Sequence, residues 1–343
     1  MRILTVTSLY LSGHGNFVAE QVRALRASRV EVDVLFFDPR ETRTHYLRAL
    51  APIARAIASD RYDLVHTHHT YTMIQVAVAK RLARSRIPVV FTHHESESLD
   101  NGRRTRTLHP TSLLRHSMLV KRNAARRADF VIFVSRKVLE ALALDWPPQE
   151  VIPCGVDLQK FRPLDRGTCR SKLGVDPMRP VIFFPANPRN LRKRFELARQ
   201  AYELVLRGAP NALLMVGGGI EADAMPLYYN AADVMLQTSY SEASPTVVKE
   251  ALACETPIVS TDVGDTREVL AGAPHCSVCP DSAGELAKQI RLAFGHRVTG
   301  GPEHLLRHGL SLEQTVAKVH DVYQRVLGAE RGAPREMTVG RPG

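Results

Sequence analysis

The sequence predicts an α/β protein made of two doubly wound domains with a cleft between them. Short apolar runs typical of buried strands alternate with segments whose apolar residues recur every three to four positions, as in amphipathic helices. This alternation breaks once, over residues 145–165, and then resumes. The length of 343 residues allows two ordinary domains, each with its own core. In doubly wound sheets ligands bind beyond the carboxyl ends of the strands, so the cleft is the place to look for a site.

The first part of the chain, residues 1–150, is predicted to form an N-terminal Rossmann-like domain. Strand patterns alternate there with helical patterns of the length that connects parallel strands. The strand candidates are residues 2–10, 30–37, 63–69, 88–94 and 129–135. The helical candidates are residues 17–28, 46–59 and 74–85, with a basic helical region before the last strand. Residues 145–165 are rich in proline and are expected to form an exposed connection.

The second part, residues 151–310, is predicted to form a second, C-terminal Rossmann-like domain. Its strand candidates are residues 180–186, 211–219, 233–239, 256–262 and 275–280. Residues 311–328 have the pattern of a closing helix, expected to pack back toward the N-terminal domain. Residues 329–343 are expected to be a flexible tail.

Composition and charge limit the classes of function. The chain is 44% apolar and 24% charged, as in soluble globular proteins, and no apolar run is long enough to cross a bilayer. The polar start of the chain does not resemble a secretory signal, and five cysteines in a chain of this length indicate reduced thiols and a cytoplasmic location. The net charge of +11 indicates an anionic partner: nucleic acid, a membrane surface or a phosphorylated small molecule.

Two glutamates with seven residues between them form the main candidate site. Glu242 precedes a predicted helix and Glu250 lies about a turn and a half inside it, roughly 7 to 8 Å from the helix start. That length is similar to the reach from a diphosphate to a ribose. Since carboxylates accept hydrogen bonds from paired hydroxyls, Glu250 is predicted to hold a ribose and Glu242 a second polyol. The alternative is that both carboxylates are merely solvated, with Glu250 paired to a nearby cation.

The start of this helix is a candidate anion site. Ser244 is predicted to be its N-cap and Pro245 its first residue. The free backbone N–H groups of Thr246 and Val247 would then face the cleft, where they could bind a phosphate.

The segment SEASPTVVKEALACETPIVSTDVGD, which contains both glutamates, resembles the signature of the family-four retaining glycosyltransferases, which have the GT-B fold. Further segments resemble that family in the same order along the chain. They are SLYLSGHGNFVAEQVRAL, VVFTHHE, VIPCGVDLQKFRP and MPLYYNAADVMLQTSYSEASP. A single E-x7-E pattern is weak, whereas the whole ordered set is specific. The family usually has Asn where Cys154 stands.

The resemblance implies a retaining, metal-independent hexosyltransferase that uses a nucleotide-sugar donor. The domain of residues 1–150 would bind the acceptor, and the domain of residues 151–310 would bind the donor. The resemblance also implies that Glu242 contacts the donor sugar, that Glu250 binds the ribose, that His94 contacts the transferred sugar, and that Gly15 lies close to the donor phosphates. The acceptor hydroxyl would attack on the face from which the leaving diphosphate departs, and the diphosphate would assist proton removal. No cofactor and no metal are expected, and the sequence contains no Asp-x-Asp motif.

The basic residues of the donor site match the family less closely. Lys193 corresponds to the family lysine, but Asn187 stands where the family usually has arginine. Arg189 or Arg192 is expected to replace it, because either guanidinium can bind a phosphate through two hydrogen bonds. This departure bears on donor affinity more than on the class of reaction.

Histidines crowd the ends of two predicted strands, and they allow other interpretations. His94 could be an ordinary strand-end residue, and a one-residue slip would exchange it with His93. Together with His66, His68 and His69 these residues could also form a metal cluster, although no carboxylate pattern accompanies them.

Residues 101–127 contain eight Arg or Lys and no acidic residue. In this stretch an apolar stripe with basic borders would suit an anionic membrane surface and a lipid-linked acceptor. The stripe residues are Leu113, Leu114, Met118 and Leu119, bordered by Arg115, Lys121 and Arg122. The alternative is an ordinary solvated helix face. Nucleic acid is not expected as a partner, because the stretch has no aromatic residue for base stacking.

The sequence therefore predicts a cytoplasmic glycosyltransferase, peripheral at the inner face of the membrane. It would transfer a sugar to a glycan, glycolipid or other hydroxyl acceptor in cell-surface polysaccharide or glycoconjugate biosynthesis. One alternative is a non-catalytic nucleotide-sugar-binding protein on the same scaffold. A nucleotide-sugar epimerase or a phosphorylase of similar architecture is a further alternative, which fits the surroundings of the two glutamates less well.

Overall fold

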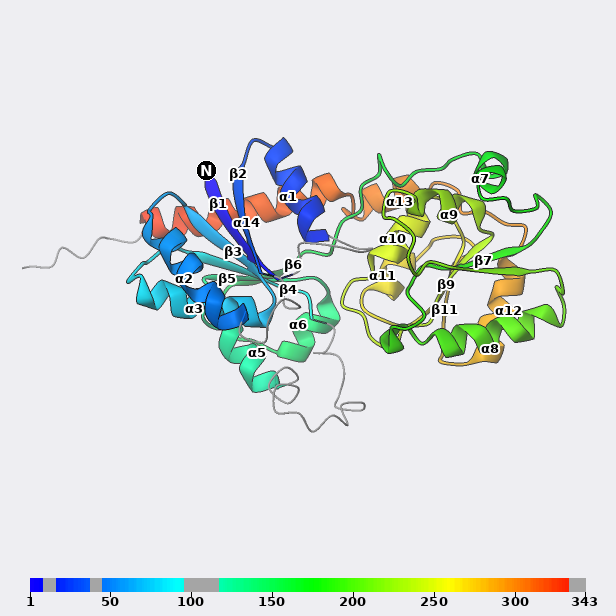
Figure 1. Cartoon of the computed structure of the whole chain (residues 1–343), viewed down its shortest axis with the longest axis horizontal. Coiled ribbons are helices and arrows are strands. Elements are labelled where there is room, and N and C mark those ends of the chain that lie inside the picture. Colours follow the sequence, from blue (N-terminus) through cyan, green and yellow to red (C-terminus); the bar gives the residue numbers. More distant parts are fainter. Residues whose placement is uncertain (9–16, 38–44, 96–116, 333–343) are drawn as a thin grey trace, which may run out of the picture.

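The structure, a computed structural model, describes residues 1–8, 17–37, 45–95 and 117–332. Figure 1 shows two α/β domains side by side, each with a sheet between helices. All strand pairs are parallel, in one sheet of six strands and one of five. The predicted fold class is confirmed.

The N-terminal sheet has the strand order β2-β1-β3-β4-β5-β6. Its strands are β1 (Arg2–Thr7), β2 (Glu31–Phe36), β3 (Leu64–His68), β4 (Val89–His93), β5 (Phe130–Phe133) and β6 (Gln149–Val151). The helices on the two faces of the sheet belong to two separate hydrophobic clusters. One face is covered by α2 (His45–Ala58), α3 (Thr70–Leu82), α5 (Met118–Ala125) and α6 (Arg136–Leu142). The other face is covered by α1 (Phe17–Ala27) and α14 (Leu312–Gly332).

Helix α14 carries the end of the described chain back to the N-terminal domain (Figure 1). Apolar side chains spaced three or four residues apart on this helix, among them Val319 and Tyr323, pack with Ile3 and Val22 in one buried cluster. The helix ends at Gly332, beyond residue 328, where the sequence pattern predicted its end. Its burial thus ties the last helix in the sequence to the first strand.

The connection over residues 145–165 is not the exposed linker that its prolines predicted. It contributes the edge strand β6, and Val156 and Phe161 are buried. Val156 donates its N–H to the carbonyl of Leu310 and accepts a bond from the N–H of Leu312, so the two chain crossings between domains run side by side. A Cβ on Gly155 would lie 2.7 Å from the carbonyl oxygen of Ser311, which only glycine avoids.

The C-terminal sheet has the order β11-β10-β9-β7-β8. Its strands are β7 (Val181–Phe184), β8 (Leu213–Val216), β9 (Val234–Gln237), β10 (Ile258–Thr261) and β11 (Ser277–Cys279). One face is covered by α8 (Phe195–Leu206) and α12 (Ala283–Ala293). The other is covered by α9 (Met225–Ala231), α10 (Thr246–Ala253), α11 (Thr266–Leu270) and α13 (Gly301–Arg307). Each strand lies inside a predicted strand range.

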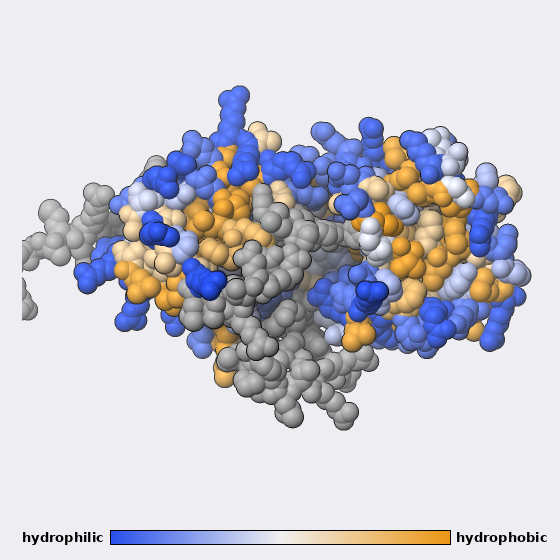
Figure 2. Space-filling model, viewed as in Figure 1, coloured by the Kyte–Doolittle hydropathy of each residue, from blue (hydrophilic) through white to orange (hydrophobic). Residues whose placement is uncertain are grey.

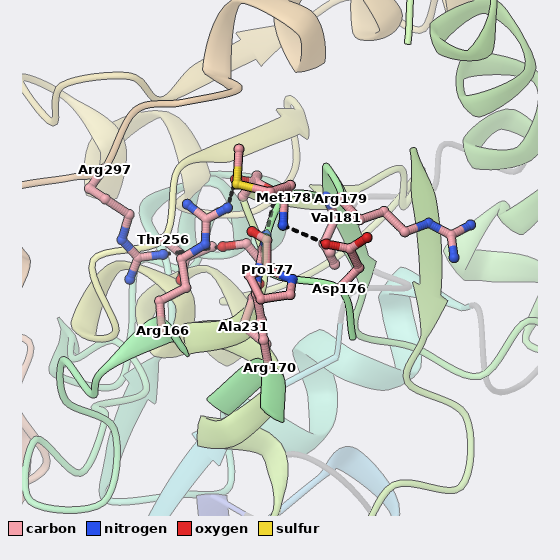
Figure 3. Close-up of polar contacts among 12 residues, drawn as sticks. Arg166, Arg170, Asp176, Pro177, Met178, Arg179, Val181, Ala231, Thr256 and Arg297 are labelled. Atoms are coloured by element: carbon pink, nitrogen blue, oxygen red, sulfur yellow. Dashed lines mark hydrogen bonds and ion pairs between the residues drawn. The ribbon is translucent and has the colours of Figure 1, made fainter. Parts of the chain in front are cut away.

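A buried ion-pair cluster fixes α7 (Arg166–Lys172) to the amino ends of these strands. Arg170 is almost fully buried and donates to Asp233 at 2.7 Å and to the carbonyl of Ala231 at 2.9 Å. Figure 3 shows Arg166 and Arg170 beside Pro177 and Ala231. Since ligands bind at the carboxyl ends of such strands, this cluster lies away from the cleft edge of the sheet and stabilises the domain.

The surface facing the viewer in Figure 2 has separate apolar patches on the two domains, with hydrophilic residues along much of the outline. Within the described residues, no helix has the length and apolar character needed to cross a membrane.

Candidate active site

A cavity of about 290 Å³ lies between the two domains at the carboxyl ends of β9 and β10. Helix α6 supplies Lys137 and Glu140, and the loop after β9 supplies Tyr240, Ser241 and Glu242. The loop after β10 supplies Asp262, Val263 and Gly264. An ion pair of 2.8 Å between Lys137 and Asp262 joins the domains at this cavity. The cavity is where doubly wound sheets place their ligands.

Glu242 lies at the cavity in contact with two cations. Its Oε1 is 2.6 Å from Nζ of Lys193, and its Oε2 is 3.9 Å from a guanidinium nitrogen of Arg192. Only 7% of the residue is exposed. Burial by itself would raise the pKa of Glu242, but the charges of Lys193 and Arg192 outweigh it and lower the pKa. The carboxylate is therefore ionised and positioned before any ligand binds.

A short 3-10 turn, Leu191–Lys193, places these cations. Thr238 donates its hydroxyl to the carbonyl of Lys193 at 2.8 Å, and Tyr240 donates its N–H to the carbonyl of Arg192 at 3.1 Å. Of the two arginines predicted to replace the missing family arginine, Arg192 therefore lies at Glu242. Arg189 is exposed, and its N–H bonds the side chain of Asn187 within the same loop. Sequence spacing could not separate these two arginines.

Glu250 projects from α10 and is 8% exposed. It accepts a hydrogen bond of 2.8 Å from the hydroxyl of Tyr229. Burial raises the pKa of Glu250, although the hydroxyl groups of Tyr229 and Thr246 oppose this. Tyr229 was not singled out from the sequence, because nothing in MPLYYN distinguishes it from Tyr228.

Ser244 is not the N-cap of α10. The helix starts at Thr246, Pro245 occupies the cap position, and no side chain caps it. The Ser244 hydroxyl donates to Asp265 and accepts bonds from Lys249 and from the N–H of Cys154. A hydroxyl has one proton and two lone pairs, so these three bonds use its full capacity.

The first helical N–H groups, those of Thr246 and Val247, have no partner inside a helix. Their role as a phosphate site stays a prediction. Gly15, the other residue predicted near the phosphates, lies outside the described residues.

His94 lies directly after β4 in the N-terminal domain, and with Phe17 and Cys154 it lines a second, smaller pocket. Its Nε2 is 3.0 Å from Nδ1 of His68, its ring centroid is 4.1 Å from that of Phe17, and its Nδ1 is 3.9 Å from Sγ of Cys154. Burial lowers the pKa of His94 well below its usual value, so the imidazole is neutral. His93 is instead fully buried, with its ring near that of Phe133.

The neighbouring histidines bind each other and the core. His66 bonds the hydroxyls of Tyr323 at 2.6 Å and Thr92 at 2.7 Å, and burial lowers its pKa to about 3. In the part of the chain that the structure describes, no group of three or more His, Cys, Asp or Glu could hold a metal ion. The alternative of a histidine metal cluster therefore has no support from the described residues.

The basic stretch is only partly described, and one of its residues corrects the predicted membrane face. Lys121 is fully buried and lies 3.5 Å from Glu95, so it faces the protein core instead of bordering an exposed stripe. Arg122 donates to the carbonyl of Leu142 at 2.7 Å. Leu119 is 70% exposed, whereas Met118 packs on the core. The rest of the predicted stripe, Leu113, Leu114 and Arg115, lies outside the described residues.

Solved structures show the same two-domain arrangement. A sucrose-phosphate synthase from Thermosynechococcus elongatus is similar with a TM-score of 0.79 and 17% identity, over 96% of this chain and 100% of that one. HepE from Anabaena, in complex with UDP and glucose, is similar with a TM-score of 0.67 and 17% identity, over 97% of this chain and 100% of that one. The fold is GT-B.

Two sequence profiles of glycosyltransferases match the chain. Residues 11–160 match the profile described as "Glycosyltransferase Family 4", and residues 179–295 match the profile described as "Glycosyl transferases group 1". Both domains therefore match glycosyltransferase profiles, the N-terminal one that of glycosyltransferase family 4.

Curated relatives match parts of the chain. A D-inositol 3-phosphate glycosyltransferase of Nocardia farcinica is 29% identical over 248 residues, which are 60% of this chain and 54% of that protein. A D-inositol 3-phosphate glycosyltransferase of Rhodococcus jostii is 33% identical over 146 residues, 34% of this chain and 32% of that protein. The match thus spans about half or less of these relatives' own length.

Proposed function

We propose that this protein is a retaining glycosyltransferase that moves a hexose from a nucleoside-diphosphate sugar to a hydroxyl acceptor. The observation that carries the proposal is the ionised Glu242, held against Lys193 and Arg192 at a cavity between the domains. Structures of HepE with UDP and with UDP-glucose support a nucleotide-sugar donor on this fold.

The donor would lie along the C-terminal wall. Lys193 and Arg192 are positioned to neutralise the diphosphate, and the N–H groups at the start of α10 would add to this positive field. Glu250, one turn further into the helix, would accept hydrogen bonds from the ribose hydroxyls. Glu242 would accept hydrogen bonds from the hydroxyls of the transferred sugar. On binding, the diphosphate would compete with Glu242 for the Lys193 ammonium and free carboxylate lone pairs for the sugar.

The reaction would proceed on one face of the sugar. The bond between C1 and the diphosphate oxygen breaks, the acceptor oxygen bonds C1 on the same face, and the acceptor proton passes to the leaving diphosphate. Configuration at C1 is thereby retained without a protein nucleophile. Lys193 and Arg192 lower the barrier because they stabilise the charge that develops on the diphosphate. His94, being neutral, would contact the sugar without adding charge.

The proposed acceptor is a glycan, glycolipid or other polyol, in cell-surface polysaccharide or glycoconjugate biosynthesis. Relatives named as D-inositol 3-phosphate glycosyltransferases support a small polyol or its conjugate as an acceptor class. Association with the inner face of a membrane through residues 101–127 stays part of this proposal. The burial of Lys121 removes one of its basic residues.

Thermal unfolding with UDP, GDP, ADP and their common sugars, with and without magnesium, tests the donor site. A ligand at a hundred times its dissociation constant adds about 2.7 kcal/mol to the stability of the folded state. We expect one base to raise the unfolding midpoint without magnesium, and Glu250→Ala to remove this shift. A shift that appears only with magnesium would contradict the metal-independent mechanism.

A transfer assay with the stabilising donor then separates catalysis from binding. Product that retains the anomeric configuration supports the proposal, and inverted product refutes it. Donor binding with no hydrolysis or transfer for any donor would favour the non-catalytic alternative.

A further inference from the structure

A buried lysine lies between the two glutamates of the candidate site, and neither glutamate uses it. Lys249 has no exposed surface, yet its ammonium group lies 2.8 Å from Oδ2 of Asp265 and 2.6 Å from Oγ of Ser244. Ser244 also donates to the same Asp265 oxygen at 2.7 Å. The three side chains form a closed triangle beneath the loop that carries Glu242.

This triangle extends to the connection between the domains. The N–H of Cys154 donates to Oγ of Ser244 at 3.3 Å, and Sγ of Cys154 lies 3.9 Å from Nδ1 of His94. His94 contacts His68 in turn. A continuous series of polar contacts therefore runs from the Lys249–Asp265 pair in the C-terminal domain, through Cys154, to His94 in the N-terminal domain.

We propose that Lys249 is a positioning residue: through Ser244 it clamps the Cys154 backbone to the Glu242 loop, and so sets Glu242 and His94 at the separation that transfer needs. The inference rests on the proposed function, since it concerns the same reaction.

The contacts of Lys249 show how it acts on Ser244. All three hydrogen-bonding positions of Ser244 are used, so its rotamer is fixed, and the ammonium supplies one of the three bonds. Oδ1 of Asp265 is buried without a partner among the described residues, so Lys249 is the cation that compensates this carboxylate. If Lys249 only stabilised the fold, its contact with Asp265 would be enough, and its hydrogen bond to Ser244 would not be needed.

The test must separate the loss of the clamp from the loss of folding stability that an unpaired buried charge causes. Lys249→Met alone would leave Asp265 uncompensated, and the protein could fail to fold. The double variant Lys249→Met/Asp265→Asn removes both charges at similar volume. Ser244→Ala removes the clamp and leaves the ion pair intact. The control is Lys288→Met/Glu285→Gln, which removes an exposed pair of 3.3 Å on α12.

The first readout does not depend on activity. Burial raises the pKa of the Cys154 and Cys276 thiols alike, to about 12. We expect both clamp variants, but not the control, to raise the rate of thiol labelling at Cys154 and leave that at Cys276 unchanged, measured by mass spectrometry on folded protein. Wild-type labelling of Cys154 in both variants would refute the clamp.

The second readout is kinetic. We expect turnover at saturating substrates to fall between tenfold and about a hundredfold in both variants, while affinity for UDP, measured by calorimetry, changes less than about twofold. If turnover stays at the wild-type level while Cys154 labels faster, the positioning role is wrong. If the wild type itself transfers no sugar, the proposed function fails, and thiol labelling alone decides whether the clamp exists.

Discussion

The two domains differ in the charge of the polar side chains that they place at the candidate site. In the N-terminal domain, burial keeps the imidazoles of His66, His68 and His94 neutral by lowering their pKa values. In the C-terminal domain, Lys193 and Glu242 are both charged and lie 2.6 Å apart. The charged groups suit the diphosphate and the hydroxyls of the proposed donor, whereas the neutral histidines add no charge to the site.

Both domains nevertheless hold the loops after their strands in the same way, with a buried ion pair. Each has a fully buried lysine paired with a buried carboxylate, Lys121 with Glu95 in the N-terminal domain and Lys249 with Asp265 in the C-terminal domain. Glu95 also accepts the N–H of Thr70 at 2.8 Å, so it joins the loop after β4 to the start of α3. The two domains differ in the charge of the polar groups at these strand ends, and they share a buried ion pair beside them.

The largest expected effect comes from breaking the N-terminal pair. Lys121→Met leaves Glu95 buried without its cation and should cost about 3–5 kcal/mol of unfolding free energy. Denaturant unfolding measures this. The exposed pair of Lys80 and Asp129, 3.4 Å apart, is the control, and Lys80→Met should cost at most about 1 kcal/mol. Equal costs for both variants would show that burial of Lys121 is not what makes its pair important.

Removing the charge of the C-terminal wall should affect catalysis more than folding. Glu242→Gln keeps the size of the side chain but not its ionised acceptors, and should lower turnover by about 10²–10³-fold. Steady-state kinetics with the donor found by thermal shift measures this. Glu140→Gln, at the opposite side of the cavity, is the comparison. An active Glu242→Gln enzyme would remove Glu242 from the reaction.

Glu250 should act on donor binding alone. Glu250→Gln loses a charged acceptor for two ribose hydroxyls, and should weaken UDP binding by about tenfold or somewhat more. Titration calorimetry with UDP checks this. Glu203→Gln, which alters an exposed contact with Arg199, should leave the affinity unchanged. A fall in turnover at saturating donor without a change in affinity would assign Glu250 to a different step.

The neutral histidines predict a loss of stability in acid. His66 in the folded state has its pKa lowered to about 3, while in the unfolded chain it is near its usual value of about 6.5. Between these pH values only the unfolded chain binds the proton, so this contribution to stability is complete above about pH 6.5 and is lost as the pH falls. The slope is about 1.4 kcal/mol per pH unit for each such histidine.

Denaturant unfolding at a series of pH values measures this slope. The control is the matched variant His275→Gln, at an exposed position before β11, whose slope is compared with that of the wild type. Between pH 6.5 and 3, His66→Gln should lower the slope of the unfolding free energy against pH by the contribution of one histidine, about 1.4 kcal/mol per pH unit. An unchanged slope would show that His66 does not stay neutral in the folded protein.

The sequence by itself determined the parallel α/β architecture and the main candidate residues. Strand and helix periodicity are local properties, so they placed the strands of both sheets correctly except β6, which lies in the segment predicted to be an exposed connection. The E-x7-E spacing predicted that Glu242 precedes a helix and that Glu250 lies inside it, as the start of α10 at Thr246 confirms. Only the tertiary structure decided which residues meet across large sequence distances. Arg192 instead of Arg189 lies at Glu242, because two hydrogen bonds hold its turn to the loop after β9.

The same reason explains the errors. Lys121 belongs to a basic stretch that resembles a membrane face, and its buried partner Glu95 lies well before it in the sequence. Ser244 has the composition of an N-cap, but Lys249, Asp265 and Cys154 together engage its hydroxyl. Local sequence records the preference of a residue, and the long-range partner that overrides this preference is known only once the chain has folded.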